Sequence, residues 1–203
     1  MKSHLPLSCF LALFITTVAG AADLGSLITD CNDCHGKDGV STEKDIPIIA
    51  GQSYVVLEDA LLAFADDSQP CKESEYRHGD TSRAAVTMCE ISARLGEDEI
   101  EAVSEHYAEL PFVAATQSFD EAMVSRGATV HDRNCEKCHS EGGSLADDDA
   151  GILAGQWTPY LRSAFDEFMS EERAMSKKMA EKMKRVKQED FEALLHFYAS
   201  EAQ

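Results

Sequence analysis

The chain contains the pattern Cys-x-x-Cys-His twice, as Cys31-Asn32-Asp33-Cys34-His35 and as Cys135-Glu136-Lys137-Cys138-His139. This pattern is the attachment sequence of a c-type haem. One helical turn places two thiols where both can bond to the edge of one porphyrin, and the next residue directs its imidazole at the iron. We therefore expect two covalently bound haem c groups. The attachment cysteines are Cys31, Cys34, Cys135 and Cys138, and the proximal iron ligands are His35 and His139.

Two other interpretations of a Cys-x-x-Cys pair require a different sequence context. A structural zinc site brings two more ligands at similar spacing, and a thioredoxin-like redox pair belongs to a βαβ unit. Neither context accompanies either copy of the motif. Haem attachment is therefore the interpretation that we adopt for both copies.

The two motifs belong to a longer internal repeat. Ala50-Gly51-Gln52 recurs as Ala154-Gly155-Gln156, at the same offset of 104 residues that separates the motifs. Further along, Tyr107-Ala108 recurs as Tyr198-Ala199, where the offset has fallen to 91 residues. The first half therefore holds 13 additional residues, and two homologous haem domains in tandem are the economical interpretation.

Local patterning predicts that both halves are helical. Apolar residues recur at three- and four-residue spacing over 54–64 and 97–110, and again over 158–168 and 188–200. No run shows convincing strand alternation with hairpin turns. We expect an all-α fold of two tandem domains, each wrapped around a covalently bound haem. The domains are residues 23–113 and 114–203, and the linker ends at Gln117.

A second axial ligand completes each iron site, and methionine is the ligand that raises the reduction potential. The first half offers Met88, and the offset of 91 residues leads from it to Met179. Met175 is the main rival, because Met175, Met179 and Met183 lie four apart and such a stripe is more often core packing. His78, ten residues before Met88, is the competing ligand in the first half. We predict that Met88 and Met179 bind the two irons.

A backbone carbonyl commonly fixes the proximal histidine by accepting a hydrogen bond from its second ring nitrogen. Pro47 stands where the carbonyl-bearing loop is expected in the first half, whereas the offset of 104 residues leads to Gly151 in the second. We therefore expect the second loop to be held differently. The histidines without a histidine partner in the repeat are expected to pack or face solvent, and they are His106, His131 and His196.

The first 22 residues have the pattern of a cleaved secretory signal peptide. Lys2 precedes an apolar run over 5–18, and small residues follow at 19–22. No other stretch approaches the roughly 20 apolar residues that a membrane span needs. We expect an exported, periplasmic protein with no membrane span in the mature chain.

The odd count of seven cysteines follows from this export. Cys9 leaves with the signal peptide, and four cysteines bind haem. Cys71 and Cys89 remain, both in the region where the first half is longer. In an oxidising compartment we expect them to form a disulfide that holds the additional segment beside Met88. The alternative is a redox-active dithiol or a persulfide-carrying cysteine next to the haem.

The charge of the chain argues against a nucleic-acid partner. It has 18 Lys and Arg against 37 Asp and Glu, a formal net charge of −19, whereas phosphate binding depends on basic side chains. Residues 23–116 carry 6 basic and 20 acidic side chains, and residues 117–203 carry 11 and 17. The basic cluster over 177–187 flanks Met179 and is either a docking surface or an ordinary helix face.

These residues resemble a known family. Tandem Cys-x-x-Cys-His domains with Gly-Gln helices are similar to the diheme class I cytochromes c of the c4 type, and the second half is more similar to the cytochrome subunit of flavocytochrome c sulfide dehydrogenase. The first half matches only the general haem-domain pattern. The resemblance of the second half rests on Gln117-Ser118-Phe119-Asp120, the motif at 135–139, Glu141-Gly142-Gly143, the run at 152–161 that includes Gly155-Gln156-Trp157-Thr158-Pro159-Tyr160, Glu171-Glu172-Arg173, Lys177-Lys178-Met179-Ala180 and Phe197-Tyr198-Ala199-Ser200.

The resemblance implies a division of labour with a separate FAD-containing flavoprotein, which oxidises sulfide while the diheme subunit removes the electrons singly. No Gly-x-Gly-x-x-Gly pattern follows a strand here, so any flavin belongs to a partner. With histidine and methionine on both irons, we expect electron transfer without catalysis at a bound substrate. The electrons would pass on to a downstream cytochrome or oxidase.

Two other functions are compatible with the sequence. One is a free diheme carrier of the c4 type that serves a terminal oxidase or reductase. The other is a catalytic haem protein that uses an open iron or the pair Cys71 and Cys89.

Overall fold

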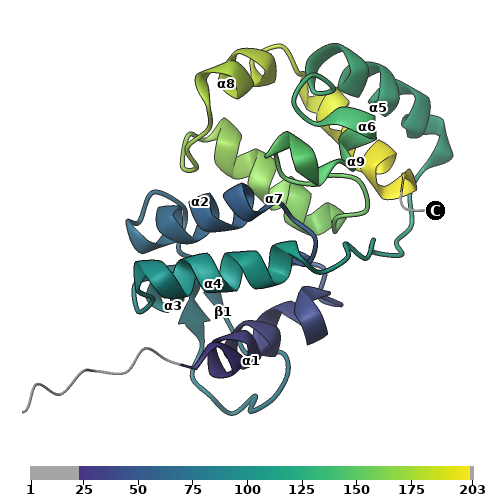
Figure 1. Cartoon of the computed structure of the whole chain (residues 1–203). Helices are drawn as coiled ribbons and strands as arrows, with labels where there is room; N and C mark the ends of the chain where they lie inside the picture. The colour runs from purple at the N-terminus through teal and green to yellow at the C-terminus, as the bar shows by residue number, and fades with distance from the viewer. Residues whose placement is uncertain (1–22, 202–203) are drawn as a thin grey trace, which may run out of the picture.

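The computed structural model describes residues 23–201 of the chain. Residues 1–22, which carry the predicted signal peptide, and residues 202–203 lie outside the described residues. The first half contains α1 (Leu24–His35), α2 (Tyr54–Ala65), α3 (Met88–Ser92) and α4 (Glu97–Ala108). The second half contains α5 (Glu121–Asn134), α6 (Ser140–Gly143), α7 (Thr158–Met169), α8 (Lys177–Met183) and α9 (Gln188–Ser200). The expected all-α architecture is confirmed, and Figure 1 shows the helices gathered into two halves.

The internal repeat is visible in the helix boundaries. α7 begins and ends 104 residues after α2, and α9 begins 91 residues after α4, as the two sequence offsets predict. Local signals explain these starts: Ser53 caps α2 by accepting a hydrogen bond from the backbone N–H of Val56, and Pro159 lies in the first turn of α7. The helices that begin each half differ, because α1 includes its haem motif whereas α5 ends at Asn134, just before the second motif.

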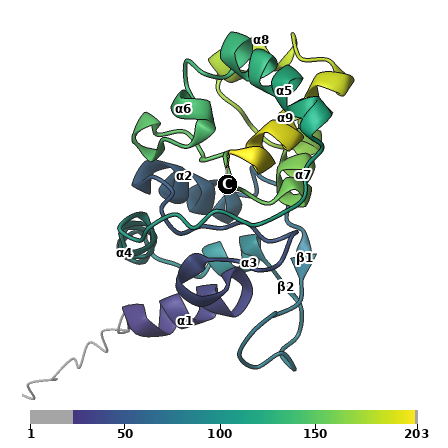
Figure 2. The same ribbon diagram turned by 90° about the vertical axis from the view of Figure 1, so that its right-hand side faces the viewer.

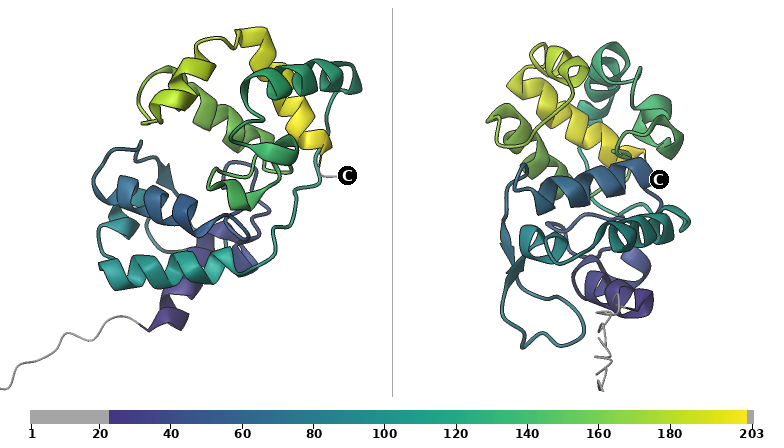
Figure 3. Two further views of the ribbon diagram at one scale, coloured as in Figure 1. Left: turned by 45° about the horizontal axis from the view of Figure 1, so that its top comes forward. Right: turned by 60° about the vertical axis from the view of Figure 1, so that its left-hand side comes forward.

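The additional segment of the first half forms the one sheet among residues 23–201. Its strands β1 (Glu73–Ser74) and β2 (Val86–Thr87) pair antiparallel, and the loop between them projects away from the helices (Figure 2 and Figure 3). The sequence predicts no strand here, and two residues per strand are too few for an alternating pattern to be recognised. After β2 the chain enters α3 through a capping box between Thr87 and Glu90.

The second half has the larger core. Its buried side chains come mainly from α7 and α9, and α5 crosses α9 where Gly127 allows close approach: a Cβ atom at this position would lie 2.1 Å from the backbone oxygen of Ala193. The core residues are Leu161, Phe165, Met183, Val186, Phe191, Leu194, Leu195, Phe197 and Tyr198.

A smaller buried cluster joins the two halves. It consists of Ile48, Ala50, Ala115 and Trp157, so it draws on loops of both halves and on the linker between them. The linker itself is held, because the backbone N–H of Ala115 donates to the carbonyl oxygen of Gly155 at 2.8 Å. The halves therefore pack against each other through the loops that follow the two haem motifs.

Among residues 23–201, no helix has the length and apolar character that crossing a membrane requires.

Candidate haem-binding sites

The first motif lies on the last turns of α1. The helix ends at His35, and Gly36 follows with a φ of 78°, a conformation that favours glycine. Cys31 and Cys34 are free thiols and not joined to each other. Burial raises the pKa of the Cys31 thiol to about 11, so it behaves as a neutral, half-buried group. Two free thiols one helical turn apart are what thioether attachment requires.

A carbonyl oxygen fixes the ring of His35. Nδ1 of His35 lies 2.9 Å from the carbonyl oxygen of Pro47, as the sequence predicts. Because a carbonyl oxygen can only accept, the proton must sit on Nδ1, and Nε2 keeps a free lone pair. Burial also lowers the pKa of His35, which favours the neutral ring. A neutral imidazole with an unprotonated Nε2 is the form that binds iron.

The second motif follows α5 as an irregular turn. The backbone N–H of His139 donates to the carbonyl oxygen of Cys135 at 3.0 Å, which retains one helical turn's spacing between the motif's ends. Cys135 and Cys138 are also free thiols. Burial lowers the pKa of His139, so this ring too is held in its neutral form.

The expectation that the second loop is held differently is wrong. Nδ1 of His139 lies 3.1 Å from the carbonyl oxygen of Gly151, which matches the bond between His35 and Pro47. The acceptor is a backbone group, so the side chain at this position can change without loss of the bond. Both proximal histidines therefore have the same tautomer and the same kind of support.

Two buried tyrosines support the motifs, and sequence reasoning gave them no role. The hydroxyl of Tyr107 donates to Oδ1 of Asn32 at 2.9 Å, and the hydroxyl of Tyr198 lies 3.0 Å from Nδ1 of His131. Burial raises the pKa of both phenols well above the usual value, so both stay neutral. Their recurrence at the offset of 91 residues was the signal that could have identified them.

His131 is a buried structural residue, within the packing role expected for it. Its ring is 0% exposed, and Nε2 lies 2.8 Å from a carboxylate oxygen of Glu136, inside the second motif. His131 therefore bonds to Tyr198 through one ring nitrogen and to Glu136 through the other. The chain from Tyr198 through His131 to Glu136 ties the motif's turn to α9.

The predicted methionine ligands both lie at the start of a short helix after a hydroxyl cap. Met88 is the first residue of α3, and Met179 is the third residue of α8, where its backbone N–H donates to Ser176. Met175 precedes α8, so it does not share a helix with Met179, although both pack against the core of the second half. The choice of Met179 over Met175 stays a prediction.

His78 is the alternative to Met88. Among the described residues its buried Nε2 atom has no hydrogen-bond partner, and its ring lines a pocket beside Asn32 and Asp33 of α1. Neither motif cysteine of this half lines that pocket. The assignment of Met88 as the ligand also stays a prediction.

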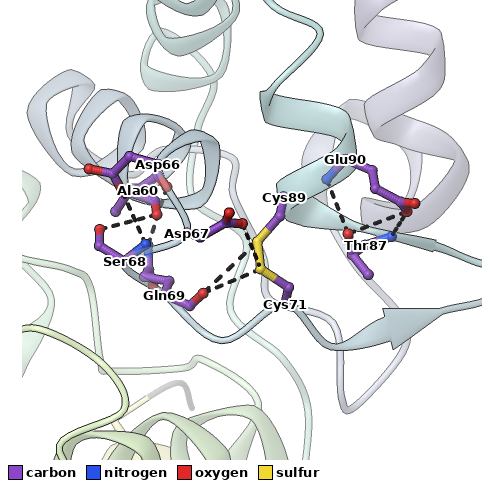
Figure 4. Close-up of a disulfide and its surroundings, with 10 residues drawn as sticks. Ala60, Asp66, Asp67, Ser68, Gln69, Cys71, Thr87, Cys89 and Glu90 are labelled. Atoms are coloured by element: carbon purple, nitrogen blue, oxygen red, sulfur yellow. Dashed lines mark hydrogen bonds between the residues drawn. A yellow bond between two sulfur atoms is a disulfide. The ribbon is translucent and has the colours of Figure 1, made fainter.

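Cys71 and Cys89 are joined in a disulfide next to Met88. The bond closes a sequence separation of 18 residues and links the segment before β1 to α3. Figure 4 shows the disulfide with Asp67 and Gln69 beside it. The additional segment is therefore covalently tied to the helix that begins with Met88.

The residues present fit haem c. The donor set of each half contains two free thiols and a neutral imidazole with a free lone pair. In the first half, α2 consists largely of apolar residues and yet none of them is buried, with Leu57, Leu61 and Phe64 all partly exposed. A flat apolar group lying against this helix would remove these side chains from water.

Comparisons with solved structures agree with this arrangement. Cytochrome c4 of Acidithiobacillus ferrooxidans matches with a TM-score of 0.66 and 20% identity, covering 85% of this chain and 99% of its own. Cytochrome c4 of Pseudomonas stutzeri matches with a TM-score of 0.66 and 21% identity, covering 88% and 98%. A thiosulfate dehydrogenase of Marichromatium purpuratum matches with a TM-score of 0.64 and 23% identity, covering 84% of this chain but 36% of its own. No protein-family profile and no curated protein sequence matches the chain.

The fold is therefore that of two cytochrome c domains in tandem. Each of the two domains carries one Cys-x-x-Cys-His site, and the donor groups of that site fit one covalently attached haem c.

Proposed function

We propose that this chain is an exported electron-transfer protein of the periplasm that carries two haem c groups. The observation that carries the proposal is the pair of equivalent sites, in which a loop carbonyl holds Nδ1–H of each proximal histidine. Cys31 and Cys34 attach the first haem, and Cys135 and Cys138 the second. The two domains span 23–113 and 114–203.

Haem iron, when bound, supplies one-electron redox chemistry. The residues of this chain that would hold the two irons are His35 and His139 through Nε2, and Met88 and Met179 through their sulfurs. With a histidine and a methionine on each iron, no position would be left for a substrate. The polypeptide transfers electrons and leaves substrate chemistry to a partner.

The partner that we favour is a sulfide-oxidising flavoprotein containing FAD. The second half supports this choice through its distinctive sequence over 152–161, which resembles the cytochrome subunit of flavocytochrome c sulfide dehydrogenase. Two haems, each accepting one electron, together oxidise a reduced flavin that holds two electrons. The likeness to a solved thiosulfate dehydrogenase is a second link to the oxidation of sulfur compounds. A downstream cytochrome or oxidase would receive the electrons.

A free diheme carrier is the second candidate function. Two observations favour it: the solved cytochromes c4 are covered over 98–99% of their length, and the first half has an acidic surface and a disulfide-tied segment of its own. Such a carrier would deliver electrons to a terminal oxidase or reductase.

Two experiments test the proposal one after the other: measurement of the haem content, and then reduction by a partner. Purified mature protein is expected to contain two haems, and Cys138→Ser should remove or weaken only the second attachment, with Ser140→Ala as the control. The protein should then be reduced by a sulfide-oxidising flavoprotein only when sulfide is present. Failure to contain haem c refutes the cytochrome assignment, whereas two haems without reduction by the flavoprotein favours the free carrier.

A further inference from the structure

Two glutamines cross between the halves in a reciprocal way. Gln52 and Gln156 are repeat partners at the offset of 104 residues, each directly after the Ala-Gly that precedes α2 or α7. Both side chains are buried, with 6% and 2% exposure. Each side chain reaches into the other half.

The side-chain oxygen of each glutamine accepts from a backbone N–H of the opposite half, and the two N–H groups occupy equivalent positions in the repeat. Oε1 of Gln156 accepts from the backbone N–H of Ile48 at 3.0 Å, and its Nε2 donates to the carbonyl oxygen of Ile48 at 2.9 Å. Oε1 of Gln52 accepts from the backbone N–H of Ile152 at 2.9 Å. Ile48 and Ile152 are themselves 104 residues apart, so the two bonds from backbone N–H to glutamine oxygen are pseudo-symmetric. The Nε2 bonds are not, because Nε2 of Gln52 donates within its own half, to the carbonyl oxygen of Ile48 at 3.5 Å.

These N–H groups belong to the peptide units that hold the proximal histidines. The peptide between Pro47 and Ile48 accepts from Nδ1 of His35 through its oxygen and donates to Gln156 through its N–H. The peptide between Gly151 and Ile152 accepts from Nδ1 of His139 and donates to Gln52. A single peptide unit therefore lies between each histidine ring and a glutamine of the opposite half.

A peptide unit that donates through its N–H becomes more polarised, and its carbonyl oxygen becomes a better acceptor. A stronger acceptor draws the Nδ1 proton of the histidine more firmly and leaves more electron density on the ring. A more electron-rich imidazole favours oxidised over reduced iron, so it lowers the reduction potential. The glutamine of one half thus acts on the iron ligand of the other half.

We propose that Gln52 and Gln156 are positioning residues for the proximal histidines across the interface, so that each half adjusts the potential of the other half's haem. This inference rests on the proposed function, because it requires a haem iron bound to His35 and His139. It assigns Gln156 to the haem of the first half and Gln52 to the haem of the second half.

The test is a crossed shift in the two potentials. Gln52→Leu removes the acceptor for the Ile152 N–H and should raise the potential of the second haem. Gln156→Leu should raise that of the first. The expected size is about a two- to threefold rise in the ratio of reduced to oxidised haem at fixed solution potential, because cooperative strengthening is a fraction of one hydrogen bond. Spectroelectrochemical titration measures the potentials, and NMR resonances of the His35 and His139 rings assign them.

Two further variants separate this role from a structural one. Gln52→Glu keeps an oxygen that accepts from the Ile152 N–H, so the second haem's potential should stay at or below the wild-type value. Gln69→Leu is the matched control, since Gln69 is equally buried at 7% in the same half but donates to Ala60. It should leave the second haem's potential unchanged.

Each outcome decides the inference. Crossed shifts with rescue by Gln52→Glu support it. Shifts confined to the haem of the mutated half, equal shifts of both haems, or no shift overturn it while leaving the electron-transfer proposal intact. If Gln52→Leu does not fold, an increase in the second haem's potential in Gln52→Glu still overturns it. A wild-type chain without two haems overturns both proposals.

Discussion

The carbonyl oxygens of Pro47 and Gly151 accept the same hydrogen bond, from Nδ1 of His35 and of His139, although proline and glycine have different side chains. Each accepts from Nδ1 and thereby selects the tautomer that leaves Nε2 free. A comparison of side chains alone treats proline and glycine as a mismatch, whereas the backbone oxygen is common to both. The requirement at this position is therefore the loop's geometry.

The carboxylate of Glu136 accepts hydrogen bonds from His131 and from the backbone N–H of Gly142. These bonds lead to a prediction about how the stability of the protein depends on pH. The hydrogen bond from His131 is the main cause that lowers the pKa of Glu136 below its ordinary value of 4.5. A lowered folded-state pKa gives stability that is present above the unfolded pKa and is lost as pH falls through the folded pKa. Glu136→Gln should therefore be less stable than wild type near neutral pH, and the difference should shrink below about pH 4.5.

Thermal unfolding followed by far-UV circular dichroism across this pH range is the measurement. Asp132→Asn, which changes an exposed carboxylate on α5, is the matched control and should give a difference that varies little with pH. A Glu136→Gln deficit that persists unchanged into acid would show that the charge of Glu136 is not what stabilises the turn.

The residues of the haem motifs could be predicted from the sequence because their spacing is local. Cys31, Cys34 and His35 lie within about one turn of helix, so five consecutive residues are enough to predict how these side chains are arranged. The bonds of Gln52 and Gln156 could not be predicted, because their partners lie 100 and 108 residues away and depend on how the halves pack. A glutamine after Ala-Gly looks the same whether it bonds to its own turn or to another domain.

At the scale of elements, the helices were predictable where apolar spacing and capping residues agree. The predicted ranges 158–168 and 188–200 correspond to α7 and α9 within one residue at each end. The structure of the additional segment was not predictable from the sequence. Its strands β1 and β2 are stabilised by pairing with each other and by the disulfide, and no periodic apolar pattern marks them. Its structure depends on contacts that are distant in sequence.

The disulfide leads to a prediction about this segment. Replacing both Cys71 and Cys89 by serine frees a loop of 18 residues, which should cost about 3 kcal/mol of unfolding free energy by the chain-entropy account. Because the proposed iron ligand Met88 is adjacent to Cys89, we also expect the methionine-to-iron absorption band of the oxidised protein to fall by about half, since only one of the two proposed methionine ligands is affected. Denaturant titration and optical spectroscopy measure the two effects.

The second haem is the internal control for the disulfide variant, because Met179 lies in the half without a disulfide. Retention of the full band together with lost stability would show that the disulfide holds the segment but does not position Met88.

The crossing of α5 and α9 gives a second prediction for elements. Gly127→Ala would place a methyl group 2.1 Å from the backbone oxygen of Ala193, and backbone at a helix crossing cannot move aside cheaply. The overpacking should exceed the gain in helix propensity and cost about 2–3 kcal/mol net. Ser125→Ala, at an exposed position on the same helix, should change stability by no more than about 0.5 kcal/mol. Chemical denaturation of the two variants distinguishes these outcomes.

For the whole molecule, the two halves share a fold but not a surface. The additional segment gives the first half a cross-half ion pair, because Lys72 reaches Glu167 of α7. Residues 23–116 carry 6 basic and 20 acidic side chains, residues 117–203 carry 11 and 17, and the basic cluster over 177–187 covers α8 and the turn after it. A charged redox partner of the proposed electron carrier would therefore meet a strongly acidic first half and a less acidic second half.

Trp157 breaks the symmetry of the interface and allows its strength to be measured. The indole Nε1–H donates to the carbonyl oxygen of Ser41 across the interface at 2.9 Å, and the side chain is 8% exposed. Trp157→Phe leaves that oxygen without this partner and removes part of the buried area. It should weaken the interface by about 1–3 kcal/mol. Scanning calorimetry should then resolve two transitions that lie further apart than in the wild type, because the less stable half loses support from its neighbour.

The matched control for Trp157→Phe is Tyr160→Phe. Tyr160 also packs against the interface cluster, but its bond to the carbonyl oxygen of Lys44 runs through its backbone N–H and survives the substitution. Its thermogram should stay close to that of the wild type. Equal separation of the transitions in both variants would mean that the bond from Trp157 to Ser41 is not what specifically couples the halves. Unchanged separation in Trp157→Phe would mean that the halves are coupled mainly through their other contacts, among them the bonds of the two glutamines and the backbone bond from Tyr160 to Lys44.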